Sequence, residues 1–123
     1  PESNICTDGL LGGKPHPRVY GSFPRVLGKF VREMQTMTLE EAIYKMTHKP
    51  AITFKIENRG LLKEDYFADI VIFDESKIID KGTFIEPTQF PDGIDYVLVN
   101  GNFAVKEGKS TNQLAGKVIR IKK

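Results

Sequence analysis

YVLVNGNFAV (residues 96–105) predicts two antiparallel strands joined by a tight turn. Asn100-Gly101 stands between two apolar runs, and this pair adopts the positive φ angles that a two-residue hairpin turn requires. Working outward, residues 68–73 are apolar except for Asp69, which is typical of a strand covered on both faces. Residues 117–121 predict one last alternating strand. The C-terminal half is therefore expected to be a sheet.

The N-terminal half has the period of helices. From Ile5 the sequence predicts the end of one strand, followed by a glycine- and proline-rich loop at residues 9–21. An amphipathic helix is expected to open at residues 23–25, with Pro24 in its first turn. Thr38 and Glu41 form a capping box for a second helix over residues 39–47, which Pro50 helps to stop. Residues 52–56 alternate as in a strand, although a loop is the other interpretation.

These elements predict an α+β fold in which two helices precede four or five strands. The strands are too few to close a barrel, and an isolated sheet would expose its edges. We therefore expect the chain to be cut from a longer protein and to need the remainder of the same polypeptide as a partner. On its own it is expected to self-associate through these open edges.

Composition narrows the class of protein. The 123 residues carry 18 basic and 16 acidic side chains, and the basic ones are scattered, so nucleic-acid binding is not expected. No apolar run reaches the ~18 residues of a membrane span, so no membrane association is expected. Cys6 is the one cysteine, which excludes an internal disulfide framework and fits a cytoplasmic location.

Three residues are candidates for a site. Asp8 lies in Thr7-Asp8-Gly9 at the expected strand end, where a carboxylate before a glycine usually serves turn chemistry. His16 and Arg18 lie in Pro15-His16-Pro17-Arg18, and the arginine could bind a substrate carboxylate with two hydrogen bonds or be solvated on a rigid loop. The chain has two histidines in different segments, so it is not expected to hold a complete zinc site.

Two further acids at the expected strand ends are interpreted as structural. Asp69 and Asp74 flank the apolar run, where a carboxylate commonly accepts hydrogen bonds from nearby backbone N–H groups. Phe84 and Phe90 fall among prolines and glycines, and a lid on a larger body and a plain core patch explain them equally well.

Together the segments resemble the C-terminal part of the D-aminoacylases (N-acyl-D-amino-acid deacylases) of the amidohydrolase superfamily. Residues 68–74 and residues 96–101 are shared widely across amidohydrolases, whereas the combination of residues 15–18 with residues 21–28 is narrower and indicates the acylase branch. The remaining matching stretches are residues 7–9, 39–43, 45–47 and 83–84. Thr7 replaces the usual serine, and Asp65 stands where related sequences often have glycine in a turn.

The resemblance implies a (β/α)8 barrel that holds zinc, joined to a small β-sandwich built from both ends of the chain. Residues 1–55 would be the C-terminal end of the metal-dependent hydrolase barrel, and residues 56–123 part of the composite sandwich. It implies that Asp8 accepts a proton from zinc-bound water and passes it to the leaving amine. Asp8 could also be a metal ligand, in the intact parent only. The other zinc ligands would lie upstream.

The resemblance also implies that Arg18 and His16 contact the substrate's carboxylate. The intact parent is expected to hydrolyse N-acyl-D-amino acids to a carboxylate and a D-amino acid, and the isolated chain to lack both activity and tightly bound zinc. Two alternatives stay open. One is a stand-alone binding or assembly domain, and the other is an amidohydrolase acting on cyclic amides, as dihydroorotases and hydantoinases do.

Overall fold

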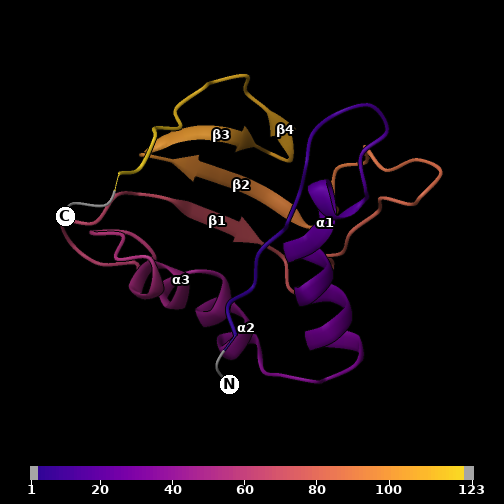
Figure 1. Cartoon of the computed structure of the whole chain (residues 1–123), viewed down its shortest axis with the longest axis horizontal. Helices are drawn as coiled ribbons and strands as arrows, with labels where there is room; N and C mark the ends of the chain where they lie inside the picture. The colour runs from indigo at the N-terminus through magenta and orange to yellow at the C-terminus, as the bar shows by residue number, and fades with distance from the viewer. Residues whose placement is uncertain (1–2, 121–123) are drawn as a thin grey trace.

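The computed structural model describes residues 3–120 and shows helices followed by a four-stranded antiparallel sheet (Figure 1). This order confirms the predicted α+β class. The helical elements are α1 (Arg18–Arg25), η1 (Val26–Glu33), α2 (Leu39–Met46) and α3 (His48–Thr53), and the strands are β1 (Ile70–Phe73), β2 (Ile94–Val99), β3 (Asn102–Lys106) and β4 (Lys109–Ser110).

The hairpin is present as predicted. Asn100 and Gly101 have φ angles of 50° and 80°, so both central residues of the turn are left-handed, and β2 pairs with β3 from Val99↔Asn102 to Tyr96↔Lys106. The acid before β1 is tied to this turn, because Asp69 Oδ1 accepts a hydrogen bond from the Asn100 N–H at 2.8 Å. The structural role expected for Asp69 is thereby confirmed.

The sheet has the simple order β1-β2-β3-β4. A second left-handed turn at Glu107 and Gly108, with φ angles of 52° and 72°, leads into β4, which the sequence analysis missed. The strand predicted for residues 117–121 is wrong for residues 117–120, which have no regular structure, and residue 121 lies outside the described residues. A terminal segment with strand-like alternation forms a strand only where a neighbouring strand offers it backbone partners.

The strand in the apolar run of residues 68–73 begins later than predicted, and its side chains are less buried than predicted. β1 starts at Ile70 and pairs antiparallel with β2, from Ile70↔Leu98 to Phe73↔Ile94. Val71 and Ile72 remain about half exposed, at 52% and 49%. The expected burial of both faces is therefore not met within the described residues.

The first helix is longer at its start than predicted. α1 begins at Arg18, so Pro24 lies inside the helix and not in its first turn. Beyond Pro24 the chain widens into the π-helical turns of η1, where the Met34 N–H donates to the Lys29 carbonyl five residues back at 2.9 Å. Residues 18–21 were predicted to belong to the glycine- and proline-rich loop, and the structure shows them in α1 instead. This part of α1 packs closely against the segment that carries Asp80, since a Cβ on Gly21 would lie 2.6 Å from the Asp80 Cβ.

The second helix begins after its predicted cap and ends within one residue of its predicted end, but Pro50 does not stop helical structure. Thr38 Oγ1 accepts the Glu41 N–H at 3.2 Å, and α2 ends at Met46. A new helix, α3, follows at once, and Pro50 lies in its first turn, where a residue without an N–H is tolerated. The strand interpretation of residues 52–56 is wrong, because Ile52 and Thr53 belong to α3.

The N-terminal segment is extended and runs beside α2 without forming a strand. The Ile5 N–H donates to the Lys45 carbonyl at 3.1 Å, and the Lys45 ammonium lies 3.5 Å from the Ser3 carbonyl. The strand end predicted at Ile5 is therefore wrong within the described residues. The segment lies beside a helix and pairs with no strand there.

A small core joins the helices to the segment after β1. Leu27, Ala42 and Ile78 are buried, and the residues packed around them are Val26, Val31, Met37, Leu39, Ile43, Met46, Phe73 and Ile94. Arg32 Nη1 donates to the carbonyls of Glu75 and Ile78 at 2.9 and 2.8 Å. Among the helices of residues 3–120, none combines the length and the apolar character that crossing a bilayer requires.

Candidate functional site

Asp8 lies in a tight turn that rests on the first turn of α1. It has a φ angle of 46°, and the Thr7 hydroxyl accepts the Gly9 N–H at 3.3 Å. A Cβ on Gly9 would lie 3.3 Å from the Val19 Cα, so this glycine lets the segment approach the helix closely. The turn therefore presents the Asp8 carboxylate beside the start of α1.

The structure brings the three predicted site residues to one place. Arg18 Nη2 lies 3.3 Å from Asp8 Oδ2, and the side chains are 42% and 78% exposed. The His16 Nδ1 accepts a hydrogen bond from the Arg18 backbone N–H at 3.1 Å, which leaves the neutral ring's proton on Nε2. The Asp8 carboxylate and the Arg18 guanidinium are thus paired at an accessible surface. The His16 imidazole accepts the backbone N–H of the arginine.

A distant segment adjoins these residues. The ring of Phe84 contacts the ring of His16 edge to face, with centroids 5.1 Å apart. The loop of residues 82–90, orange in Figure 1, lies next to the indigo loop that carries Asp8 and His16. Phe84 was not among the predicted site residues. A lid and a core patch were both open for it, and the core interpretation is wrong because Phe84 is 75% exposed and lies outside the buried cluster.

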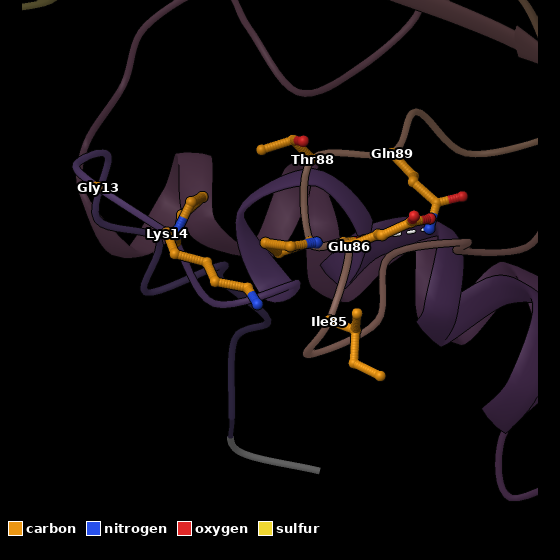
Figure 2. A pocket seen from close by; sticks show the side chains of 8 residues that line it. Gly13, Lys14, Ile85, Glu86, Thr88 and Gln89 are labelled. Carbon is orange, nitrogen blue, oxygen red and sulfur yellow. Dashed lines mark hydrogen bonds between the residues drawn. The ribbon is translucent and has the colours of Figure 1, made fainter.

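Between these two loops the surface is hollowed. The hollow has a volume of about 510 Å³ and lies between residues 13–15 and residues 85–89. Figure 2 shows Lys14 on one side and Glu86 with Gln89 on the other, and Gln89 Nε2 donates to the Glu86 carbonyl at 3.1 Å. An open space large enough for a small organic group therefore adjoins the loop that carries Asp8 and His16.

The described residues do not build a metal cage. In residues 3–120 no three side chains among histidine, cysteine, aspartate and glutamate are grouped so that they could hold a metal ion. Asp8 faces a guanidinium, and the Nδ1 of His16 is engaged by a backbone N–H. A zinc site needs three or four such ligands, so this part of the chain offers one carboxylate at most.

Comparison with known proteins gives this geometry its context. A family model described as "Amidohydrolase family" matches residues 11–105. The chain belongs to the amidohydrolase family. It is 44% identical over 116 residues to the D-aminoacylase of Alcaligenes xylosoxydans xylosoxydans, which covers 94% of this chain and 24% of that protein. The chain thus spans about a quarter of the length of that relative.

Solved amidohydrolase structures share the fold of the chain. A crystal structure of D-aminoacylase, described as defining a novel subset of amidohydrolases, superimposes with a TM-score of 0.90 at 41% identity and covers 94% of this chain and 25% of its own. An N-acyl-D-glutamate deacylase from Bordetella bronchiseptica, complexed with zinc and a phosphonate inhibitor, superimposes with a TM-score of 0.80 at 46% identity, covering 82% of this chain and 22% of its own. The family resemblance inferred from the motifs is confirmed.

Proposed function

We propose that this chain contributes the acid–base group and part of the substrate site to a zinc-dependent amidohydrolase. The substrates would be N-acyl-D-amino acids, which the whole enzyme cleaves to a carboxylate and a D-amino acid. Support comes from the relatives, which are named for this class of substrate and which the chain matches at 41–46% identity over most of its length. Within the chain, the observation that carries the proposal is the pairing of Asp8 with Arg18.

The separation of these two side chains suits the substrate. In an N-acyl amino acid the carboxylate carbon and the amide nitrogen are bonded to the same Cα. A group that binds the carboxylate and a group that protonates the nitrogen must therefore lie within a few Å of each other. Asp8 Oδ2 and Arg18 Nη2 form a direct pair 3.3 Å apart, so a substrate of this size could reach both groups once the arginine turns from Asp8 to the carboxylate.

Each residue has a defined part in this mechanism. Asp8 accepts a proton from the water that attacks the amide carbonyl and later gives it to the departing amine. Arg18 binds the substrate carboxylate with two N–H groups, leaving the pair it forms with Asp8. His16 keeps the Arg18 backbone in place through the hydrogen bond at Nδ1. His16 Nε2–H remains available as a second donor to the carboxylate.

Zinc enters the proposal through ligands outside the described residues. A bound zinc ion would supply Lewis-acid activation of the carbonyl and of the attacking water. Asp8 is the residue of this chain that would face it, as a proton acceptor or as a single ligand. The remainder of the same polypeptide would provide the histidine and other ligands, so it is the partner that completes the site.

The proposed division of the chain follows from its elements. Residues 1–55 would be the end of the hydrolase barrel, because they carry the site turn and the helices after it. Residues 56–123 would be one share of a β-sandwich. Val71 and Ile72 of β1 are half-exposed and point to opposite faces, so a second sheet would cover one of them.

The test uses the longer, active protein that contains this chain. We expect Asp8→Asn to reduce kcat by at least about 100-fold, the contribution of a general acid–base group. Zinc content and thermal unfolding should stay as in the wild type. The measurement is hydrolysis of N-acetyl-D-amino acids together with metal analysis.

Asp65→Asn is the matched control. Asp65 is also an exposed aspartate with a left-handed backbone, at φ 65° against 46° for Asp8, and should tolerate the change. Equal turnover by Asp8→Asn and the wild type would refute the proposal. Cleavage of cyclic amides in place of N-acyl-D-amino acids would assign a different substrate. Stoichiometric zinc in the purified 123-residue chain would contradict the assignment of its ligands to another part of the polypeptide.

A further inference from the structure

We propose that Phe84 is a positioning residue for the substrate-carboxylate site. Its ring holds the His16 imidazole in place and, through His16, the first turn of α1, from which Arg18 extends toward Asp8. This inference rests on the proposed function, because it assigns to Phe84 an effect on substrate binding. It gives the second half of the chain a direct part in a site whose other residues all come from the first half.

The turn that carries Phe84 is rigidly built. The Thr83 N–H donates to the Glu86 carbonyl at 3.0 Å, and the Glu86 N–H donates to the Thr83 hydroxyl at 2.9 Å. These reciprocal hydrogen bonds close residues 83–86 at both ends. Pro87, which follows, is buried. The backbone that carries Phe84 is therefore held in place, and the residue itself is 75% exposed.

The same turn is seated on the segment that carries His16. A Cβ on Gly82 would lie 3.3 Å from the Pro17 Cβ and 2.9 Å from the Pro87 carbonyl oxygen. Gly82 therefore permits close contact between the turn and Pro17, the residue between His16 and Arg18. The two segments pack through their backbones as well as through the ring pair.

Two interactions then hold the His16 ring from different sides. Its Nδ1 accepts the Arg18 N–H at 3.1 Å, and its face or edge meets Phe84 at an interplanar angle of 89°. A perpendicular ring pair is a favoured geometry with a preferred orientation, so it resists rotation of the imidazole. Without Phe84 the ring could turn, the hydrogen bond at Nδ1 would weaken, and the start of α1 would lose a support.

Phe84 is not part of the core. The buried cluster of Leu27, Ala42 and Ile78 lies elsewhere, and most of the Phe84 surface is in solvent. Removing its ring should therefore change the stability of this chain little. The ring contact that Phe84 makes within the described residues is the one with His16.

The first experiment measures kinetics in the longer, active protein that contains this chain. Phe84→Leu should raise KM for an N-acetyl-D-amino acid roughly three- to tenfold and leave kcat within about twofold, the size expected from loss of an aromatic pair. Phe84→Tyr keeps the ring and should restore the wild-type KM. A change in kcat alone, or an unchanged KM, would overturn the inference.

Phe90→Leu is the matched control. Phe90 lies in the same loop, is 73% exposed against 75% for Phe84, and makes a similar edge contact, with the ring of Tyr20 at 5.8 Å. It does not contact His16 in this structure. Because Tyr20 also lies in the first turn of α1, the KM of this variant should rise by less than that of Phe84→Leu if the His16 ring carries the effect. An equal rise in KM for both variants would show a general loosening of the loop and would overturn the specific role of Phe84.

A second measurement separates failure of this inference from failure of the proposed function. Proton NMR of the His16 ring in the 123-residue chain should show a shift on Phe84→Leu and none on Phe90→Leu, because an aromatic ring shifts protons close to it. An unmoved His16 signal overturns the contact itself. If the whole protein does not hydrolyse N-acyl-D-amino acids, the proposed function fails and the role in binding with it, while a moved His16 signal still shows that the contact stands.

Discussion

Asp74, at the end of β1, shows how an exposed carboxylate is held ionised. Its Oδ1 accepts hydrogen bonds from the Ser76 hydroxyl at 2.6 Å and the Ser76 N–H at 2.9 Å, and its Oδ2 lies 2.9 Å from the Lys77 ammonium. The Ser76 hydroxyl and then Lys77 lower the pKa of Asp74 from 3.8 to about 2. The structural role predicted for this acid at a strand end is confirmed.

The pH dependence follows from the sign of this change. Because the folded pKa lies below the unfolded one, the stabilisation by ionised Asp74 is complete above about pH 4 and is lost as the pH falls toward 2. Ser76→Ala should raise the pKa of Asp74 toward 3.8, because it removes the side-chain hydrogen bond that lowers this pKa most. A carboxyl-carbon NMR titration measures this. An unchanged pKa of Asp74 in Ser76→Ala would contradict the prediction.

Among the elements, α2 depends on its cap. Thr38 Oγ1 satisfies the Glu41 N–H, and the helix places Ala42 in the core, where it is fully buried. Thr38→Ala should lower the free energy of unfolding by about 1 kcal/mol, measured by urea denaturation. Thr38→Ser keeps the oxygen and should lose much less. Equal stability of Thr38→Ala and the wild type would mean that packing alone sets the start of α2.

The helices also show which elements local sequence can predict. The cap at Thr38 and the turn at Asn100-Gly101 depend on neighbouring residues only, and both were predicted from them. α3 was not, because Pro50 signals an end to a helix as readily as the first turn of a new one. In the structure the chain continues as a helix and buries Ala51.

At the scale of the whole molecule, the sheet is open at both sides in the described residues. β1 pairs only with β2, the two-residue β4 forms the other edge, and Ile72 on β1 is 49% exposed. An exposed apolar edge favours pairing with another chain. We therefore expect the 123-residue chain alone to self-associate as its concentration rises, which sedimentation analysis measures.

A charge on the edge strand tests this expectation. Ile72→Lys should weaken the association, because a lysine at a sheet edge opposes pairing. Ile85→Lys is the control, since Ile85 is 80% exposed but lies outside the sheet, and it should associate as the wild type does. A wild-type chain that stays monomeric at every concentration would contradict the prediction, as would equal association of the two variants.

The sequence by itself predicted that helices precede strands, the hairpin and the cap of α2, because each is encoded within a few neighbouring positions. Asp8, His16 and Arg18 were candidates from their motifs, and their roles remain proposals. Only the tertiary structure decided that Asp8 and Arg18 face each other, that residues 5–7 form no strand, and that Phe84 adjoins His16. These facts depend on segments up to 68 positions apart in the chain meeting in space, as His16 and Phe84 do. Contacts of that kind arise from the packing of whole elements, which local residue patterns do not specify.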